Sequence, residues 1–451
     1  MDVTKEITKI IEYQNSILPQ HKRKSKIAID AIVEQVISDY QNKSYDFSKL
    51  EVFSLNQAGK KRNIRTYAEF SCEEILSIYL KRLLDRRYYI TYPNRNKFIH
   101  SLFDLLSAVK DMNDFTIMKF DFEDFFNSIS STYVYELCIK DSTLERDQKD
   151  LLNEFCQATK YTYAGLSTSN IIIEIITKRF DDLIRQIFSN YGLIYYRRYI
   201  DDGILIFNKY IDDISCRSLI DKAINSIFLD LAVSSPVRCK TRLNLSKIRH
   251  ISKRDLSTAY PASKEFDFLG YQFVMNLNVK RKVVIRYGIT QKKIDKYNDK
   301  IDKLISSCSS EQDEYLRHCI RAYTQRTVYR QKKYNYEIWK VKGFIANYGE
   351  LRYYVNKLTP DTEAFLKNMV KEGFTRAGID IPYYLKGKED ENPYNLYNNL
   401  VKKRTLLFVE GIGISKETLE KMCDEVEVND LDGKEYSGLV RDYLIRIKVG
   451  H

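Results

Sequence analysis

The chain contains little of what interrupts regular structure: its 451 residues include 16 glycines and 7 prolines. Hydrophobic residues make up 44% of the sequence and charged residues 30%, which excludes low-complexity and disordered classes and predicts folding throughout. A chain of this length exceeds one hydrophobic core, so we expect two or more domains or subdomains.

The sequence also lacks paired cysteines and long apolar runs. Its eight cysteines form no C-x-x-C pair, which argues against a zinc site or a disulfide framework and predicts reduced thiols in the core. They are Cys72, Cys138, Cys156, Cys216, Cys239, Cys308, Cys319 and Cys423. No apolar run approaches the roughly 18 residues that cross a bilayer, and residues 1–6 show no signal-peptide pattern. We therefore expect a cytoplasmic protein with no membrane partner.

Positive charge exceeds negative charge, since 73 Lys and Arg against 61 Asp and Glu give a net charge of +12. This balance favours a polyanionic partner such as nucleic acid. The basic cluster at residues 21–26 is either a contact for such a partner or a solvated surface.

The most informative stretch is Arg198–Gly203, which lies between the apolar segments Leu193–Tyr196 and Ile204–Phe207. Two short β-branched and aromatic runs, joined by a segment that ends in Asp-Gly, predict a tight β-hairpin with its turn at the aspartates. On the simplest interpretation, Asp202-Gly203 only supplies the positive φ angles of that turn.

A second apolar strand, residues 117–120, runs into the acidic segment Asp121–Asp124. Acidic side chains from two strand ends can share a pair of Mg²⁺ ions, and two such ions hold the attacking and leaving oxygens of a phosphoryl transfer. The two stretches together therefore indicate phosphoryl-transfer chemistry.

Cations precede these acids in the chain. Residues 52–55 and 60–65 flank a turn at 56–59 and predict a hairpin with a basic second strand. Its cations are Lys60, Lys61, Arg62 and Arg65. Such groups can clamp a triphosphate, which guanidinium binds bidentately; the alternative is ordinary surface charge.

Small and polar residues form a loop at 162–170, which enters a helix over 171–190 that Ser169 or Asn170 caps. A helix N-terminus beside acidic strand ends is placed to receive a nucleotide. Glu410–Lys416 resembles the hairpin of a helix-hairpin-helix DNA-binding element, with a plain turn and cap as the alternative. The remaining pattern predicts helices over 73–85, 98–110, 132–160 and 210–230, strands over 266–273 and 283–286, and lysine- and tyrosine-rich helices from about 290 to the C-terminus.

Residues 52–275 resemble the polymerase domain of reverse transcriptases, in the branch that contains retron, group II intron and bacterial defence enzymes. The resemblance rests on motifs that occur in the family's order. They are the cations at 60–65, Phe120–Ile129, Gly165–Asn170, Tyr199–Asp202, Asn244–Lys247 and Phe268–Tyr271.

This resemblance implies the site residues. Asp121, Asp201 and Asp202 match the catalytic aspartates, which bind metal together with the backbone carbonyl of Phe122, and Phe126 matches the aromatic gate that excludes a ribose 2′-OH. The residues implied to bind nucleotide are Lys60, Lys61, Arg62, Arg65, Phe126, Gly165 and Lys247, and those of the primer grip are Tyr199, Leu269 and Gly270. The implied cofactor is a pair of Mg²⁺ ions, with Mn²⁺ as the alternative.

The implied fold is α+β: a right-hand polymerase with fingers, a palm built on an antiparallel sheet, and a thumb, followed by a helical C-terminal extension. The expected parts are an N-terminal helical segment at 1–50, fingers at 51–110, a palm at 111–275 with part of the fingers at about 131–165, a thumb at 276–350 and the extension at 351–451.

The nucleotide loop departs from the family's usual pattern. Where the family usually has Pro-Gln-Gly and then Ser-Pro, this chain has Tyr163-Ala164-Gly165 and Ser169-Asn170. Ala164 thus replaces the glutamine that touches the incoming nucleotide, which argues against ordinary templated, processive copying. No HNH-type endonuclease or RNase H pattern is found, and beyond residue 290 the chain resembles abortive-infection and other defence-associated reverse transcriptases.

The expected function is an RNA-directed or template-independent DNA polymerase of bacterial anti-phage defence that uses dNTPs. The alternatives are a retron-type enzyme that copies a dedicated noncoding RNA, and a catalytically weak nucleic-acid-binding scaffold. The Tyr-x-Asp-Asp motif and the bulky Phe126 argue against an RNA-dependent RNA polymerase. The template, the primer (RNA, DNA or a protein hydroxyl) and any further partner, an identical subunit or a second defence protein, stay open.

Overall fold

The computed structural model describes residues 3–18, 22–57, 60–308, 313–333, 336–386, 392–429, 431 and 433–448, with backbone alone at 56, 57, 60–62, 332, 333 and 336. The chain divides into two compact units. Unit 1 comprises Met1–Arg95 and Met112–Asp255, and unit 2 comprises Asn96–Asp111 and Leu256–His451. Residues 96–111 therefore pack with the C-terminal part of the chain. The polymerase names of the expected parts stay predictions.

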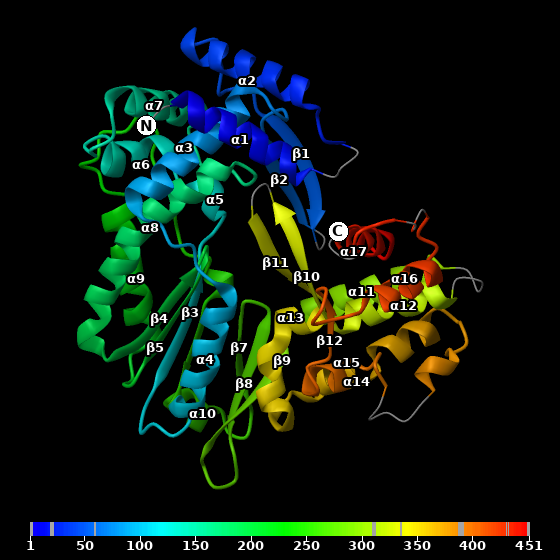
Figure 1. Cartoon of the computed structure of the whole chain (residues 1–451). Helices are drawn as coiled ribbons and strands as arrows, with labels where there is room; N and C mark the ends of the chain where they lie inside the picture. Colours follow the sequence, from blue (N-terminus) through cyan, green and yellow to red (C-terminus); the bar gives the residue numbers. More distant parts are fainter. Residues whose placement is uncertain are drawn as a thin grey trace. The chain divides into compact units, whose positions relative to one another are not determined.

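Unit 1 is built on a four-stranded antiparallel sheet in the order β4-β5-β3-β6 (Figure 1). The strands are β3 (Thr116–Asp121), β4 (Leu193–Tyr199), β5 (Asp202–Phe207) and β6 (Arg249–Ser252). Every residue of β3 is buried, as suits an inner strand of mostly apolar sequence. The predicted strand before Asp121 and the predicted central hairpin are both confirmed.

Helices complete unit 1, and α8 packs against α3, α9 and β4. Buried rings of Phe120, Phe122, Phe180 and Phe228 join sheet and helices, with centroids 5.5 to 6.4 Å apart. This aromatic core anchors the end of β3 from which the acidic residues emerge. The helices are α1 (Val3–Ile17), α2 (Lys26–Gln41), α3 (Cys72–Tyr88), α5 (Phe125–Ser128), α6 (Ser131–Val134), α7 (Arg146–Thr159), α8 (Ser167–Phe188) and α9 (Asp213–Phe228).

The basic hairpin is confirmed: β1 (Glu51–Gln57) pairs antiparallel with β2 (Lys60–Thr66). The expected cap of the long helix is wrong. Helix α8 begins at Ser167 with Leu166 as its N-cap, so Ser169 lies inside the first turn. There its hydroxyl accepts a hydrogen bond from the backbone N–H of Tyr163 at 2.9 Å, which fastens the preceding loop to the helix.

Unit 2 contains a second antiparallel sheet, β7-β8-β9, made of β7 (Lys264–Phe268), β8 (Tyr271–Leu277) and β9 (Val283–Ile289). The single strand expected over 266–273 is therefore wrong. Leu269 and Gly270 form a two-residue turn in its middle, with φ angles of +51° and +87°. A hairpin turn of this kind requires positive φ at both positions, and Gly270 accepts it without strain.

The expectation of helices throughout the chain beyond residue 290 is wrong, because strands lie at 326–333, 336–342 and 405–408. The rest of the expected extension at 351–451 is mostly helical where it is described. The three strands form a third sheet, β11-β10-β12. It consists of β10 (Arg326–Lys333), β11 (Tyr336–Lys342) and β12 (Thr405–Phe408). β-Branched and aromatic residues in these segments favour strands despite the many cations. The helices of unit 2 are α4 (Arg95–Val109), α11 (Gln291–Ser306), α12 (Asp313–Thr324), α13 (Phe344–Tyr348), α14 (Pro360–Arg376), α15 (Leu396–Val401), α16 (Lys416–Glu425) and α17 (Tyr436–Arg446), while α10 (Lys253–Ala259) spans the boundary between the units.

The segment 410–416 follows strand β12, so it lacks the first helix of a helix-hairpin-helix element. Ser415 instead caps α16 by accepting a hydrogen bond from the backbone N–H of Thr418 at 3.2 Å. A side chain at Gly413 would lie 2.0 Å from the carbonyl oxygen of Leu407, which explains the glycine. The simpler interpretation, a turn with a cap, is confirmed.

Six of the eight cysteines are buried, which agrees with the predicted core position of the thiols. Within the described part of the chain, no helix combines the length and the apolar character that a membrane crossing needs.

Candidate active site

Strand β3 ends at Asp121, whose side chain is buried. The segment Asn244–Lys247, more than a hundred positions further along the chain, contacts it. Lys247 donates hydrogen bonds from Nζ to both carboxylate oxygens of Asp121, at 2.9 and 2.8 Å. Asn244 donates its backbone N–H to the Asp121 carbonyl at 2.8 Å and its side-chain amide to Oδ2 at 3.4 Å. Partial burial lowers the pKa of Lys247, but hydrogen bonds and charge from Asp121 outweigh it and raise that pKa. Lys247, which the resemblance implies to bind nucleotide, thus lies beside Asp121, and pattern alone did not reveal the role of Asn244.

The turn of the central hairpin lies one residue earlier than the predicted turn at Asp201 and Asp202. Tyr199 pairs with Asp202 across the hairpin, so Ile200 and Asp201 form the turn. Ile200 adopts a φ of +58°, which is strained for a β-branched residue. The expectation that Asp202-Gly203 supplies the positive φ angles is wrong. Gly203 is a strand residue whose added Cβ would lie 2.2 Å from the Phe120 ring, so close packing requires the glycine.

The register of the sheet brings the acidic residues together. Asp202 lies directly opposite Asp121 on neighbouring antiparallel strands. The backbone N–H of Phe122 donates to the carbonyl of Asp201 at 3.2 Å, which joins the end of β3 to the turn. Two segments that are 80 positions apart in sequence therefore present their carboxylates in one place.

Burial and crowding perturb Asp202. Its carboxylate lies 3.4 Å from the ammonium of Lys119, a side chain that is itself 4% exposed. The pKa of Asp202 is raised to about 7. Burial is the largest cause and is partly offset by the positive charge of Lys119, while the negative charges of Asp201 and Asp121 raise the pKa further. No role for Lys119 was predicted from the sequence. The pattern that could have revealed it is a single cation within a mostly apolar strand, because a buried cation needs a partner of opposite charge.

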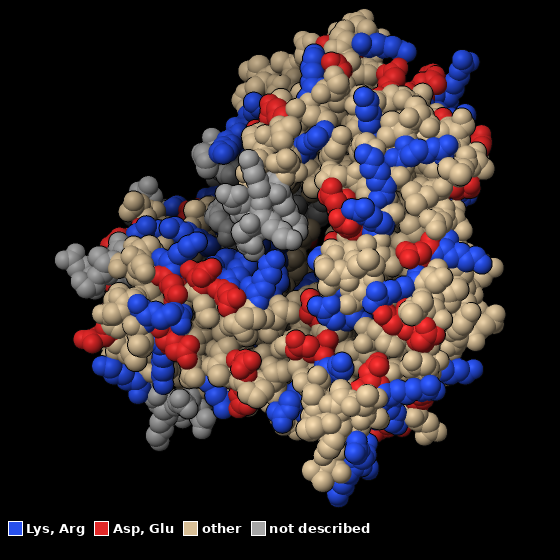
Figure 2. Space-filling model, turned by 180° about the vertical axis from the view of Figure 1, so that it is seen from behind, with Lys and Arg blue, Asp and Glu red and all other residues tan. Residues whose placement is uncertain are grey.

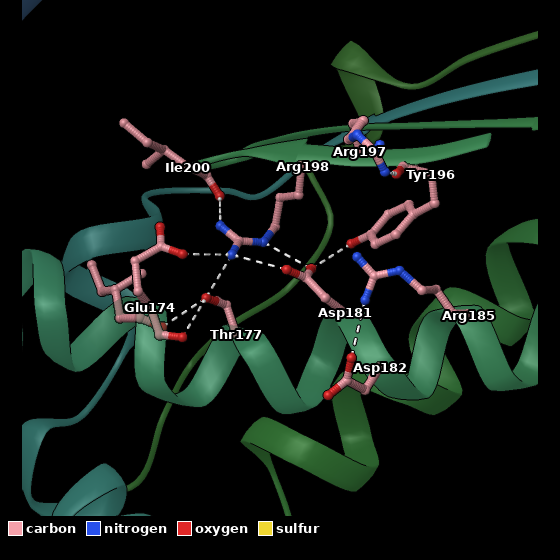
Figure 3. A network of polar contacts seen from close by, with 10 residues as sticks. Glu174, Thr177, Asp181, Asp182, Arg185, Tyr196, Arg197, Arg198 and Ile200 are labelled. Atoms are coloured by element: carbon pink, nitrogen blue, oxygen red, sulfur yellow. Dashed lines mark hydrogen bonds and ion pairs between the residues drawn. The ribbon is translucent and has the colours of Figure 1, made fainter. Parts of the chain in front are cut away.

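A second network holds the turn from below (Figure 3). Arg198, with 3% of its side chain exposed, donates to the carbonyl of Ile200 at 2.8 Å. The same guanidinium binds Asp181 through Nε at 3.0 Å and Glu174 through Nη2 at 3.0 Å. Thr177 accepts at 2.7 Å, and the Tyr196 hydroxyl donates to Asp181 at 2.6 Å. Glu174, Thr177 and Asp181 project from successive turns of α8, so this helix fixes the strained turn through Arg198.

The predicted sugar gate lies on α5, next to this site. Phe126 is partly exposed, whereas its neighbour Phe125 is buried and stacks on Phe122 at 4.6 Å between centroids. The Thr162 hydroxyl donates to the Phe126 carbonyl at 2.5 Å and connects α5 to the altered nucleotide loop. Phe126 thus combines a fixed backbone with a ring that is open to solvent on one side.

The basic hairpin contacts the altered loop directly. The Arg65 guanidinium lies 3.6 Å from the centroid of the Tyr163 ring, and its backbone N–H donates to the Ala164 carbonyl at 2.9 Å. Gly165 has a φ of +108°, and an added Cβ would lie 2.4 Å from Ile64 and 2.5 Å from the Arg65 carbonyl oxygen. Gly165 therefore permits strand β2 to approach the loop.

The other predicted site residues are distributed as follows. The side chains of Lys60, Lys61 and Arg62 lie outside the described residues. Tyr199 ends β4 opposite Asp202 in unit 1, whereas Leu269 and Gly270 form the β7–β8 turn of unit 2.

Comparison with known proteins gives little further identification. No protein-family model matches the chain, and no curated protein matches it. Among the solved structures that match is the apo telomerase from Candida tropicalis truncated from its C-terminal domain, at 13% identity and a TM-score of 0.32. The similarity covers 56% of this chain and 60% of that one, so this chain spans less than two thirds of the telomerase chain. A likeness at this level shows neither family nor activity.

The donor atoms at the aspartates fit Mg²⁺, which prefers carboxylate, carbonyl and water oxygens. Asp121, Asp201, Asp202 and the carbonyl of Phe122 could provide them, and a cation would relieve the repulsion that raises the pKa of Asp202. Lys247 contacts both oxygens of Asp121, so metal binding requires its ammonium to move.

Among the described residues, potential metal ligands from three side chains come within 4.8 Å of one another only at Glu314, His318 and Glu425. His318 there bonds Glu425 at 2.6 Å and the Tyr443 hydroxyl at 2.8 Å, and Arg317 pairs with both glutamates. This group is accordingly an ion network whose positive charge comes from Arg317.

Proposed function

We propose that the protein is a DNA polymerase of the reverse-transcriptase type, which transfers nucleotides from dNTPs at Asp121, Asp201 and Asp202. One observation carries the proposal: the sheet register sets Asp202 opposite Asp121, directly after the turn that contains the strained residue Ile200. An acidic pair that only stabilised the fold would not need buried, mutually repelling carboxylates, and perturbed acids of this kind are concentrated at functional sites.

Asp121 and Asp201, with Asp202 and the Phe122 carbonyl, would hold a pair of Mg²⁺ ions. When bound, such ions activate a primer hydroxyl and stabilise the departing pyrophosphate. The chain's own contribution is rigidity, because β3 fixes Asp121 and the Arg198 network fixes the turn that carries Asp201. Positioned charge of this kind needs no reorganisation during reaction.

Lys247 is suited to two states. In this structure its ammonium neutralises Asp121, and a cation bound to Asp121 would take over that role and leave the lysine available to the nucleotide. A lysine ammonium is protonated at neutral pH, so Lys247 can donate a proton to the leaving pyrophosphate. Phe126 would exclude the 2′-OH of a ribonucleotide by steric contact.

The polymerase is either RNA-directed or independent of a template, and the altered loop argues against ordinary templated, processive copying. Ala164 has no side-chain amide, and its carbonyl is bonded to Arg65, which stacks on Tyr163. The resemblance places such an enzyme in bacterial anti-phage defence, within the cytoplasm. A retron-type enzyme with a dedicated noncoding RNA is the second candidate, and it would be accompanied by a noncoding RNA gene next to its own.

The test uses purified protein with Mg²⁺ and labelled dNTPs, first without added nucleic acid and then after nuclease treatment. The Asp201→Ala, Asp202→Ala protein is the control. Product that survives removal of co-purified RNA and stays attached to protein supports protein-primed, untemplated synthesis. Product that vanishes with the RNA supports the retron-type enzyme. No product, even with primed RNA supplied, overturns the polymerase in favour of a nucleic-acid-binding scaffold.

A further inference from the structure

Unit 2 carries an exposed aromatic residue on a basic pair of strands, which we call the ribbon (β10, Arg326–Lys333, and β11, Tyr336–Lys342). Trp339 is the chain's only tryptophan, and 53% of it is exposed. Val341, two positions on and hence on the same face of β11, is 39% exposed. Strand β11 is the edge of its sheet, so among the described residues no further strand pairs with its outer side. An exposed tryptophan with an apolar neighbour is unusual on a surface that serves only solubility.

The ribbon as a whole carries an excess of positive charge. Its two strands contain six Lys and Arg residues and a single acid, Glu337, and these charges are divided between the two faces. Arg330 lies directly opposite Trp339 in the register, and its guanidinium is 4.8 Å from the centroid of the Trp339 ring. Glu337 pairs with Arg330 at 3.3 Å and neutralises only part of this charge.

Further cations crowd the end of the ribbon. The pKa of Lys300 in α11 is lowered. Burial is the largest cause, and the positive charges of Lys296 and of Lys342 at the end of β11 add to it. Like charges held together in this way are relieved by an anion. The distribution matters because net charge alone does not locate a binding surface: in Figure 2, Lys and Arg side chains are spread over the visible face and interspersed with Asp and Glu.

We propose that this face of the ribbon binds single-stranded nucleic acid, with a base stacked on Trp339 and the adjoining phosphate on Arg330. Stacking on an aromatic ring beside cations is how proteins hold unpaired strands, and it requires no particular sequence. A duplex cannot use the ring, because its bases are already stacked on each other. The proposal shares only the partner class with the proposed function; it needs neither Mg²⁺ nor dNTPs.

The single tryptophan makes the contact directly measurable. Full-length protein in chelator, so that no turnover occurs, is titrated with oligothymidylate, with oligouridylate of equal length and with a blunt duplex, while tryptophan emission is recorded. We expect quenching by the single strands and none by the duplex. The DNA and RNA arms identify the preferred sugar. Equal quenching by duplex, or none by any strand, overturns the proposal.

Variants separate stacking from charge. Trp339→Ala should weaken single-strand binding about tenfold, measured by the anisotropy of a labelled oligonucleotide, and Trp339→Phe should retain most of it. Tyr353→Ala is the matched control, because Tyr353 is 59% exposed beside Arg352, at 4.3 Å, but lies outside the ribbon. Equal weakening by Trp339→Ala and Tyr353→Ala would contradict a stacking site at Trp339.

Two further measurements keep the proposals apart. The Asp201→Ala, Asp202→Ala protein should quench as the unaltered protein does, so loss of synthesis with intact quenching would sink only the polymerase. Trp339 emission that changes on dilution without nucleic acid would mean that a second copy of the chain covers the ribbon, which overturns single-strand binding.

Discussion

Two antiparallel hairpins carry arginine near an aromatic residue, and they place it in opposite environments. In β4–β5, Arg198 is buried and binds Asp181, Glu174 and the Ile200 carbonyl. In β10–β11, Arg330 is exposed, with 48% of its side chain accessible, and lies over Trp339. Helix α8 covers the first hairpin, whereas the face of the second that bears Trp339 is open to solvent.

The contrast shows how burial assigns a role to a charge. A buried guanidinium must bond fully, so Arg198 can only hold other groups in place. An exposed guanidinium keeps its donors available, and its contact with a ring costs little to rearrange. We therefore expect the first hairpin to be sensitive to any change in its ionic groups and the second to tolerate them.

The largest expected effect tests whether the acids of the first hairpin's sheet are catalytic. Asp121→Asn should lower dNTP incorporation on the order of 10³-fold or more, because a strand-end metal ligand is lost. Glu123→Gln, two residues further on, removes an exposed carboxylate that pairs with Arg242 at 2.7 Å and should change incorporation by about twofold at most. Similar losses from both substitutions would contradict a specific role for Asp121.

Replacing each of the two arginines by methionine tests the contrast between the hairpins directly. Arg198→Met should lower the free energy of unfolding by about 3–5 kcal/mol, because two partly buried carboxylates lose their partner. Arg330→Met should lower it by less than about 1 kcal/mol. Urea unfolding of both variants gives the values, and comparable losses would refute the contrast.

Arg198→Lys separates folding from positioning. Lysine restores the positive charge but cannot reach the Ile200 carbonyl and both carboxylates at once. We expect it to recover part of the stability while dNTP incorporation stays reduced.

Local pattern was sufficient to predict both sides of the candidate site, because each hairpin or strand is encoded in about ten contiguous residues. It placed the β4–β5 turn one residue late, since Asp-Gly usually marks the turn, whereas Gly203 is required by the Phe120 ring, which belongs to another strand. The pattern predicts helix across the ribbon because cations and tyrosines dominate its composition, although Ile338, Trp339 and Val341 favour a strand.

Contacts over long sequence separations could not be predicted from pattern. The partners of Arg198 lie 17 to 24 positions away, on a helix whose register decides which side chains face the sheet. Lys119 was overlooked because its partner, Asp202, is brought beside it only by strand pairing. Lys247 was placed by family resemblance, since 126 residues separate it from Asp121.

The raised pKa of Asp202 predicts a pH dependence of stability. Its pKa of about 7 in the folded protein lies above the ordinary value of 3.8, so the folded state binds the proton more tightly. The contribution of Asp202 to stability is therefore largest at low pH and falls as pH rises from about 4 to about 7. Between about pH 5 and about pH 8 the loss amounts to about 2–3 kcal/mol in chelator.

Asp202→Asn should remove this part of the pH dependence, as unfolding at several pH values would reveal. Mg²⁺ should reduce it in the unaltered protein, since a cation stabilises the carboxylate. A slope that is unchanged in Asp202→Asn would mean that another group is responsible.

The smallest effect tests the close packing beneath the turn. Gly203→Ala forces a methyl group against the Phe120 ring, and we expect unfolding to become easier by about 1–3 kcal/mol. Gly349→Ala adds the same methyl group where no atom lies within 4 Å, so its effect should stay within about 0.5 kcal/mol. Because Gly203 adjoins Asp202, the displaced strand should also lower incorporation, whereas Gly349→Ala should leave it unchanged. A stable Gly203→Ala protein with full incorporation would show that the acids do not depend on the register that sets them opposite each other.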